Sequence, residues 1–346
     1  MVTFRGEQMK IDILCTDGSP IGVIPADIYG TNGRVGVGGS ELALLTLCQA
    51  WTKRGDDVVL YNNPKGPVEE FPQLPVERFD KEQDRDILIV FRTPNYAVQG
   101  AKGKKVWWSC DQYTSADFKL FAPEVDEIVT ISQFHAEYFK EKYGINRTTI
   151  IDIPVRTWEY GQQIERVKNQ VIFCSVPDRG LKEMGEVWRC INEQMPEASL
   201  IITSDYRLWG VSAAMNEQYM FQFVNKNARV LGAVLRKELI EYQLSSDLMV
   251  YPCTYDELFC ISVAECSVAG AYPITSSTGA LATTNMGYVL PGNPLDLGWQ
   301  RALAGQVVDI LNDPKRLENL RSMLMIEARE RFNISKILKQ WDKVFN

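Results

Sequence analysis

Histidine is almost absent from the sequence, since His135 is the only one among 346 residues. A serine–histidine–aspartate triad or a Cys/His zinc site would have to use it, and no residues at ligand spacing stand near it. His135 follows Ser132, which is expected to cap a helix with a hydrophobic stripe. The sequence therefore argues against both kinds of chemistry, and His135 is interpreted as a structural or exposed residue.

Further absences concern the compartment and the kind of partner. No two of the eight cysteines have Cys-x-x-Cys spacing, and several lie in apolar runs, which is typical of buried free thiols in a reducing compartment. No apolar run reaches the roughly 18 residues of a membrane span, and the N-terminus lacks a signal-peptide pattern. With a net charge of -7 and no basic tail, a nucleic acid is not expected as the main partner. We predict a cytoplasmic protein without a transmembrane segment, at most peripheral to a membrane.

The sequence contains instead a regular alternation of short apolar runs and helical patterns. Near-continuous apolar strands separated by helices are typical of parallel sheets covered on both faces. The alternation runs through the chain twice, and the polar residues 155–170 separate the two passes. We therefore predict an α/β fold with two doubly wound, Rossmann-like domains facing a cleft, where ligands commonly bind. The predicted domains are residues 1–157 and 158–330, followed by a C-terminal helix over 331–346 that would cross back to the N-terminal domain.

The expected elements are defined by these runs. The strands are expected at 11–16, 57–62, 87–92, 105–110, 127–131, 149–153, 171–176, 199–203, 228–231, 248–251, 272–275 and 287–290. The helices are expected at 40–54, 133–143, 184–194, 236–245, 261–269, 298–312 and 314–331.

A glycine-rich segment, residues 31–41, follows the first expected strand and includes Gly38 and Gly39. Glycines let the backbone approach a ligand closely, Ser40 would cap the next helix, and free N–H groups at a helix start can hold a phosphate or a hydroxyl. The spacing is not G-x-G-x-x-G, which disfavours a nicotinamide dinucleotide site. A plain surface loop is the alternative interpretation.

Two cations follow the first strand of the second half. Arg179 and Lys182 are three positions apart, at a strand end and just before a helix. Two positive charges and a helix N-terminus in one place suit a diphosphate. The alternative is a pair of exposed charges, but cations at a helix start oppose the helix dipole.

Two acids frame the next loop-to-helix junction. Glu257 follows a buried strand, and Glu265 lies eight positions later in a helix of small residues. Ligands bind at strand ends in open α/β sheets, and carboxylates there can accept hydrogen bonds from the hydroxyls of a sugar. The alternative is a solvated acid and a helix-cap acid.

Four motifs now stand in sequence order: Gly38-Gly39-x-Glu41, Pro177-Asp178-Arg179-Gly180-Leu181-x-x-Met184, Val230-Leu231-Gly232 and Asp256-Glu257-Leu258-Phe259-x(5)-Glu265. In this order they resemble retaining glycosyltransferases of the GT-B fold, most closely glycosyltransferase family 4. The acid pair resembles the E-x7-E motif of that family. The resemblance spans about residues 10–345, and its second half is the more specific.

The resemblance implies a role for each matching position. Arg179 and Lys182 would hold the donor diphosphate, Glu265 the ribose and Glu257 the donor sugar. The other implied donor contacts are Gly38, Gly39, Leu231, Gly232, Leu258, Phe259, Gly279 and Ala280. The implied catalytic residues are Arg179, Lys182, Glu257 and Asp111. The donor would be a nucleotide diphosphate sugar, with UDP, GDP and ADP unresolved.

The reaction that the resemblance implies is transfer with retention to a hydroxyl of a glycan or a lipid-linked glycan. The acceptor hydroxyl would attack on the leaving-group side, and the departing phosphate oxygen would help to take its proton. No metal and no further cofactor would be required, because Arg179 and Lys182 neutralise the leaving group.

One stretch, Trp107-Trp108-Ser109-Cys110-Asp111, departs from the family pattern. Related enzymes often carry a histidine where Cys110 stands, and a thiol is a poor partner for sugar hydroxyls. Asp111 would then orient the acceptor or the sugar, or it would simply cap the strand end. The departure also admits an alternative function, a catalytically weak or inactive GT-B module that binds a nucleotide sugar or a glycan.

Other enzyme classes fit less well. A sugar-nucleotide epimerase of this shape would need more acid/base histidines, and a phosphorylase would need a pyridoxal-binding lysine in a longer chain. A Rossmann oxidoreductase is disfavoured by the glycine spacing.

Overall fold

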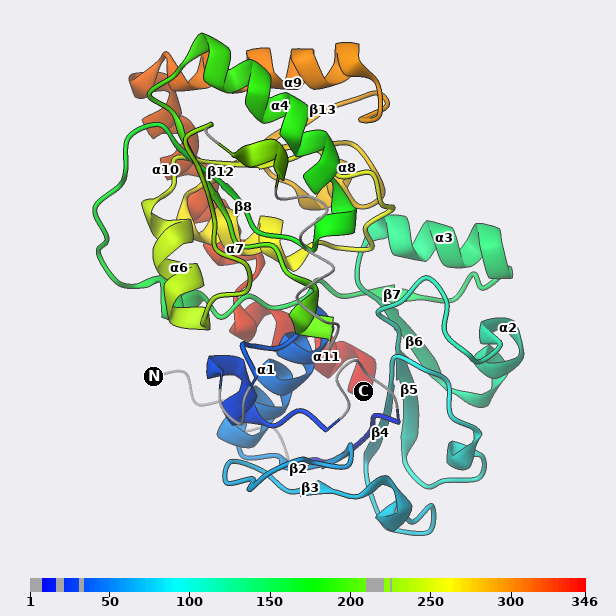
Figure 1. Cartoon of the computed structure of the whole chain (residues 1–346). Coiled ribbons are helices and arrows are strands. Elements are labelled where there is room, and N and C mark those ends of the chain that lie inside the picture. Colours follow the sequence, from blue (N-terminus) through cyan, green and yellow to red (C-terminus); the bar gives the residue numbers. More distant parts are fainter. Residues whose placement is uncertain (1–7, 17–21, 31–33, 210–220, 225) are drawn as a thin grey trace. The chain divides into compact units, whose positions relative to one another are not determined.

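The computed structural model describes residues 8–16, 22–30, 34–209, 221–224 and 226–346 (Figure 1). The chain divides into two compact units. The first comprises the described residues of Met1–Pro25, Ser40–Pro154 and Ile334–Asn346, and the second those of Ala26–Gly39 and Val155–Asn333. Both are built on parallel sheets with helices between the strands, so the predicted α/β fold class is confirmed.

The first unit contains a seven-stranded sheet in the order β3-β2-β1-β4-β5-β6-β7. Ile13 of β1 lies beside Leu60 of β2 on one side and Ile89 of β4 on the other, and all three are buried. Burial on both faces explains why these strands are apolar throughout. The strands are β1 (Lys10–Leu14), β2 (Asp57–Tyr61), β3 (Gln73–Leu74), β4 (Ile87–Phe91), β5 (Lys104–Trp108), β6 (Glu127–Thr130) and β7 (Thr149–Ile150).

The helices of the first unit include the C-terminal one. Trp341 of that helix packs its ring against Trp51 and Trp108, with centroids 5.5 and 5.3 Å away. The last helix of the chain therefore completes the core of this unit. The helices are α1 (Gly39–Arg54), α2 (Phe118–Phe121), α3 (Gln133–Tyr143) and α11 (Ile334–Phe345), with short 3-10 turns at Val76–Arg78, Tyr96–Val98 and Ala122–Glu124.

Helix α3 shows how local sequence sets its own ends. The Ser132 hydroxyl accepts a hydrogen bond from the backbone N–H of His135, and Gly144 ends the helix in the left-handed region. His135 is fully buried, and its Nδ1 accepts a hydrogen bond from the N–H of Ile131 at 3.3 Å. The structural interpretation of His135 is therefore confirmed.

The second unit contains a six-stranded sheet in the order β10-β9-β8-β11-β12-β13. The order reverses between β8 and β11, and ligands bind beside such a switch point in doubly wound sheets. The strands are β8 (Gln170–Phe173), β9 (Ser199–Ile202), β10 (Ala228–Val230), β11 (Leu248–Tyr251), β12 (Tyr272–Ser276) and β13 (Tyr288–Leu290).

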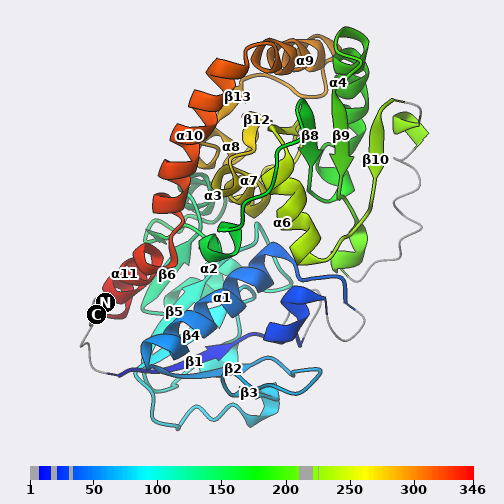
Figure 2. The same ribbon diagram turned by 90° about the vertical axis from the view of Figure 1, so that its left-hand side faces the viewer.

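Helices cover this second sheet, with α4 packed on α9 and α7 packed on α6 and α10 (Figure 2). They are α4 (Leu181–Gln194), α6 (Arg236–Ser245), α7 (Ile261–Ala269), α8 (Leu281–Thr284), α9 (Leu297–Leu311) and α10 (Pro314–Arg331). Short 3-10 turns span Pro25–Tyr29, Thr157–Tyr160, Pro177–Arg179, Tyr206–Trp209 and Phe221–Phe223.

Each predicted strand and helix is present, with differences at the ends. Helix α4 begins at Leu181, three residues before the predicted start, and β5 ends at Trp108, two residues before the predicted end. Strand β3 was not predicted, because two residues are too few for a periodic pattern. All eight cysteines are buried and free, as predicted. Within the described residues no helix combines the length and apolar character needed to cross a membrane.

Candidate functional site

The switch point of the second sheet brings two of the predicted charged residues together. Arg179 ends the 3-10 turn after β8, and Glu257 lies in the loop after β11. The guanidinium Nη1 of Arg179 is 2.8 Å from Oε2 of Glu257, and the guanidinium also stacks 3.8 Å from the ring centroid of Tyr255. The hydroxyl of Tyr251 donates to the other oxygen of Glu257 at 2.7 Å. Both carboxylate oxygens of Glu257 therefore have protein partners.

The charge of Arg179 is stable in this setting. Burial alone would lower the pKa of Arg179, but the carboxylate of Glu257 and the hydroxyls of Tyr251 and Tyr255 raise it above its ordinary value. Arg179 is thus a permanent, largely buried cation at the strand ends, suited to an anion. Sequence reasoning predicted the arginine and the acid but not that they pair.

Gly180 makes this arrangement possible. Its φ is 113°, and a Cβ atom built on it would come within 2.3 Å of the carbonyl oxygen of Pro252. Only glycine fits such a conformation and contact. The turn from β8 into α4 can therefore lie against the chain that leaves β11, which sets Arg179 beside Glu257.

Lys182 lies in the first turn of α4, where the backbone N–H groups have no partners within the helix. Its side chain is exposed, and no ion pair or hydrogen bond joins it to another described residue. An exposed cation and open N–H groups are thus available to one anion.

A second glycine holds the loop of Glu257 in place. Gly279 has φ 59°, and a Cβ there would meet both N and O of Glu257 at 2.5 Å. The N–H of Ala280 donates to the carbonyl oxygen of Glu257 at 2.6 Å. Leu258 and Phe259 turn their side chains into the interior, since both are buried. Gly279 and Ala280 therefore act on the site through the backbone of Glu257.

Glu265 lies deeper than Glu257. It stands in α7, is only 3 % exposed, and has its Oε1 3.0 Å from Nη1 of Arg236. Cys266, the next residue, has its Sγ 3.6 Å from that of Cys174. The predicted acid pair is thus divided between two arginines, Glu257 with Arg179 and Glu265 with Arg236.

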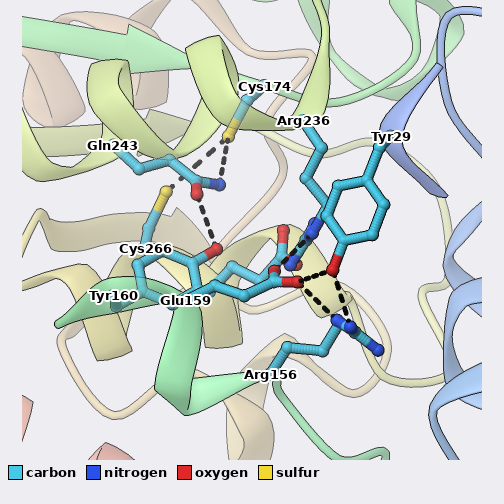
Figure 3. Close-up of polar contacts among 9 residues, drawn as sticks. Tyr29, Arg156, Glu159, Tyr160, Cys174, Arg236, Gln243 and Cys266 are labelled. Atoms are coloured by element: carbon cyan, nitrogen blue, oxygen red, sulfur yellow. Dashed lines mark hydrogen bonds and ion pairs between the residues drawn. The ribbon is translucent and has the colours of Figure 1, made fainter. Parts of the chain in front are cut away.

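Arg236 belongs to a polar network that sequence reasoning missed (Figure 3). Its Nε lies 2.6 Å from Oε2 of Glu159, and Oε1 of Glu159 lies 2.6 Å from Nε of Arg156. The hydroxyl of Tyr29 donates to the same Oε1 at 3.0 Å. The interpretation of residues 155–170 as a linker does not include this role, which an acid flanked by arginine and aromatic residues could have indicated.

Leu231 and Gly232 follow β10 at an edge of the second sheet. Gly232 has φ 69°, and a Cβ there would lie 2.9 Å from Oδ2 of Asp205. That oxygen accepts from the N–H of Ala233 at 2.8 Å and pairs with Arg207 at 2.6 Å. The turn at the end of β10 is thus held by the carboxylate of Asp205, which lies directly beside Gly232.

The described part of the glycine-rich segment, from Arg34 on, includes Gly38 and Gly39, while residues 31–33 lie outside the described part of the chain. Helix α1 begins at Gly39, so Ser40 is its second residue and not the predicted cap. A Cβ on Gly39 would lie 2.8 Å from Cγ2 of Ile261. A side chain at this position would therefore require Ile261 to move.

Asp111 lies in the first unit, at the end of β5, and forms a two-point ion pair with Arg92. Nε and Nη2 of Arg92 lie 2.7 and 3.2 Å from its two oxygens, and Nη1 donates to Oε1 of Glu41 at 2.6 Å. Arg92 has φ 63°, a strained conformation for arginine. Burial raises the pKa of the Cys110 thiol well above its usual value, so this residue stays a neutral thiol.

No group of three or more histidine, cysteine or acidic side chains with metal-binding geometry occurs among the described residues. The carboxylates at the predicted donor positions, Glu257 and Glu265, lie beside Arg179 and Arg236 respectively.

Known proteins resemble the chain in both sequence and fold. A family model described as Glycosyl transferases group 1 matches residues 168–330. No curated protein matches the chain. Among solved structures, sucrose-phosphate synthase from Thermosynechococcus elongatus is 16% identical, with 98% of each chain covered and a TM-score of 0.72.

Two further structures have the same fold. A glycosyltransferase from Rickettsia africae is 12% identical, with 98% of each chain covered and a TM-score of 0.74. HepE from Anabaena, solved in complex with UDP and glucose, is 14% identical, with 97% of this chain and 99% of that chain covered and a TM-score of 0.67. Residues 168–330 are therefore a domain of the glycosyl transferases group 1 family, and the chain that carries it is a transferase with the GT-B fold.

Proposed function

We propose that the protein transfers a sugar, with retention of anomeric configuration and without a metal, from a nucleotide diphosphate sugar to a hydroxyl of a glycan or a lipid-linked glycan. The observation that carries this proposal is the permanent cation Arg179 beside Glu257 and the open N-terminus of α4, at the switch point of the second sheet. A diphosphate needs a fixed positive charge and N–H donors, and these are both present there.

In the proposed mechanism the leaving group is neutralised by the protein alone. Arg179 and Lys182 hold the diphosphate and stabilise the charge that develops as the bond from the anomeric carbon to the phosphate oxygen breaks. The acceptor oxygen forms the new bond on the same face, and its proton passes to the departing phosphate oxygen. Arginine and lysine supply the charge that a divalent cation would otherwise supply, so metal chelators should leave the rate unchanged.

The other proposed contacts divide the donor along its length. Glu257 binds hydroxyls of the sugar, and Glu265 accepts from the ribose. Leu231 and Gly232 contact the base through their backbone, and the remaining donor contacts are Gly38, Gly39, Leu258, Phe259, Gly279 and Ala280. HepE was solved with UDP and glucose, and starch synthase IV from Arabidopsis thaliana with ADP and acarbose, which supports a nucleoside diphosphate donor without selecting its base.

We further propose that residues 1–157 bind the acceptor and residues 158–330 the donor, with 331–346 as a C-terminal helix. Asp111 orients the attacking hydroxyl in the place of the missing histidine. The paired state of Asp111 and Arg92 supports this, because it fixes the direction of the carboxylate.

The donor assignment can be tested with two substitutions. Lys182→Ala and Glu265→Ala should each lower kcat/KM for the donor by about 100-fold or more, because each removes a charged hydrogen-bonding group from the bound donor. A thermal-shift panel of UDP-, GDP- and ADP-sugars selects the donor, and product analysis by NMR reports the anomeric configuration.

The control for Lys182 is Lys315→Ala, since Lys315 is also an exposed lysine at the second position of a helix in the same unit. Native turnover by Lys182→Ala or Glu265→Ala would refute the assigned roles. Donor binding by the native protein without transfer or hydrolysis would instead favour the alternative, a GT-B module that binds without catalysis, for which Cys110 in place of a histidine is the supporting observation.

A further inference from the structure

Two buried atoms beside the carboxylate of Glu265 have no hydrogen-bond partner among the described residues. They are Oε1 of Glu265 and Nη2 of Arg236, in residues that are 3 % and 7 % exposed. Oε1 is 3.0 Å from Nη1 of Arg236, which is close enough for an ion pair, but it accepts no hydrogen bond from it. Arg236 is therefore an ion-pair partner of Glu265, and the lone pairs of Oε1 of Glu265 remain for another hydrogen-bond donor.

Buried polar atoms without partners are rare and call for an explanation. An arginine N–H can only donate and a carboxylate oxygen can only accept. One hydroxyl group satisfies both, because it can accept from Nη2 of Arg236 and donate to Oε1 of Glu265. The chemistry of this atom pair thus matches a hydroxyl-bearing ligand, and an anion would fit only its arginine half.

The position of Arg236 is fixed from its other side by Glu159. The two side chains meet at 2.6 Å, and Glu159 is itself held by Nε of Arg156 at 2.6 Å (Figure 3). Burial raises the pKa of Glu159, but Arg236 and Arg156 together lower it by more than burial raises it. The pKa of Glu159 therefore lies below its ordinary value. Burial likewise lowers the pKa of Arg236, and Glu265, Tyr160 and Glu159 raise it above its ordinary value. Each shift favours the charged form, so Glu159 and Arg236 are both ionised and attract each other.

Tyr29 forms the outer end of this network. It ends the 3-10 turn Pro25–Tyr29, and its side chain is half exposed. Its hydroxyl donates to Oε1 of Glu159 at 3.0 Å and accepts from Nη2 of Arg156 at 2.9 Å. Tyr29 precedes Gly39 by ten positions and Glu159 by 130. Tyr29, which precedes the glycine-rich segment, thus holds Glu159 in place, and Glu159 in turn holds Arg236.

We propose that Arg236 and Glu265 together bind one ribose hydroxyl of the donor, and that Tyr29 and Glu159 are positioning residues that hold Arg236 in place for it. This inference rests on the proposed function, because it assigns further residues to the ribose end of the same donor. It makes recognition of a ribose hydroxyl depend on a chain of contacts from Tyr29 through Glu159 to Arg236.

The test compares nucleoside diphosphates with and without ribose hydroxyls. Isothermal titration gives Kd values for UDP, GDP and ADP and for their 2′-deoxy and 3′-deoxy counterparts. The native protein should bind the ribose form at least about tenfold more tightly than one of the deoxy forms, since a hydrogen bond to a charged group is lost. In Arg236→Gln this ratio should fall to about one, in Arg236→Lys to an intermediate value, and in Tyr29→Phe by about threefold.

The ratio separates a role in binding from a role in folding, because a general loss of structure weakens ribose and deoxy forms alike. If Arg236→Gln does not fold, Arg236→Lys and Tyr29→Phe decide the question. The matched controls are Arg321→Gln, an arginine of the same unit held by Asp247 and Glu318, and Tyr143→Phe, whose hydroxyl donates to the carbonyl oxygen of Gln112. Both controls should keep the native ratio.

The outcomes are distinguishable. In one outcome the native protein binds ribose forms more tightly than deoxy forms, and Arg236→Lys and Tyr29→Phe keep the full ratio. That result would refute the roles given to Arg236 and Tyr29 but would leave the proposed function standing. A native protein that binds no nucleoside diphosphate overturns the proposed function, and the ribose assignment fails with it.

Discussion

His135 is buried against the ring of Phe139, and burial lowers its pKa to about 3. In the unfolded chain the pKa would be near 6.5. Between these values the unfolded state binds a proton that the folded state does not, so stability falls as the pH drops from 6.5 toward 3. The loss should be about 1.4 kcal/mol per pH unit. Urea unfolding at pH 7.0 and 4.5 should therefore show a loss of about 3 kcal/mol from this residue.

The contribution of His135 is isolated by comparison with His135→Asn, which cannot titrate and keeps an acceptor for the N–H of Ile131. The variant should lose less stability than the native protein over the same pH interval. Because no other histidine exists in the chain, equal losses in the two proteins would show that the imidazole does not titrate as described.

At the same scale, sequence reasoning identified the charged residues but not their partners. Arg179 and Glu257 are separated by many residues, and no periodicity in the sequence indicates that they form an ion pair. Arg236 begins a predicted helix, and no motif in the sequence identifies Tyr29 as a partner of Glu159. Contacts of this kind depend on which strand ends meet, and the sheet order that decides this is not a local property of the sequence.

The turn from β8 into α4 is the element on which the candidate site depends most. Gly180→Ala adds a Cβ in the left-handed region and 2.3 Å from the carbonyl oxygen of Pro252, so the backbone must move. We expect a loss of at least about 2 kcal/mol in the free energy of unfolding. We also expect weaker binding of nucleoside diphosphates, measured by titration at a temperature where the variant is folded, since Arg179 moves with the turn.

Gly305→Ala is the matched control. Gly305 lies within α9, and a Cβ there would meet nothing within 4 Å. This change should be neutral or stabilise the protein by up to about 1 kcal/mol, because alanine favours a helix. Native stability and binding in Gly180→Ala would contradict the role given to this turn.

Elements were predicted well in their interiors and less well where turn chemistry decides their ends. Helices α3, α6, α7 and α10 have the predicted bounds, and a glycine in the left-handed region ends both α3 and α7. Helix α4 begins earlier than predicted because Gly180 turns the chain directly into it. Strand β7 is two residues long, although its apolar run continues beyond, because the ladder with β6 ends there.

For the whole molecule, the sequence indicates two similar sheets and a C-terminal helix that crosses back to the first domain, but not that a segment of the first half joins the second unit. Residues 334–346 group with the first unit, and residues 26–39 with the second. Local hydrophobic patterns show that a segment has an apolar face, but they carry no information on the sheet that covers it. The tryptophan cluster around Trp341 and the polar contacts of Tyr29 are what tie these segments to their units.

This division leads to a prediction about how the two units respond to change. Trp341 is buried in the first unit between Trp51 and Trp108, so Trp341→Ala should lower the stability of that unit by about 3–5 kcal/mol. The proposed diphosphate, ribose and sugar contacts, Arg179, Lys182, Glu257 and Glu265, all belong to the second unit. Calorimetry should therefore show a transition at a lower temperature, while the Kd for a nucleoside diphosphate stays within about twofold of native at a temperature below that transition.

The control is Leu120→Ala, which truncates an exposed side chain of the same unit and should change neither the transition temperature nor the Kd. If Trp341→Ala abolished nucleotide binding while the protein remained folded, the nucleotide site would depend on the first unit, and its assignment to residues 158–330 would have to be abandoned.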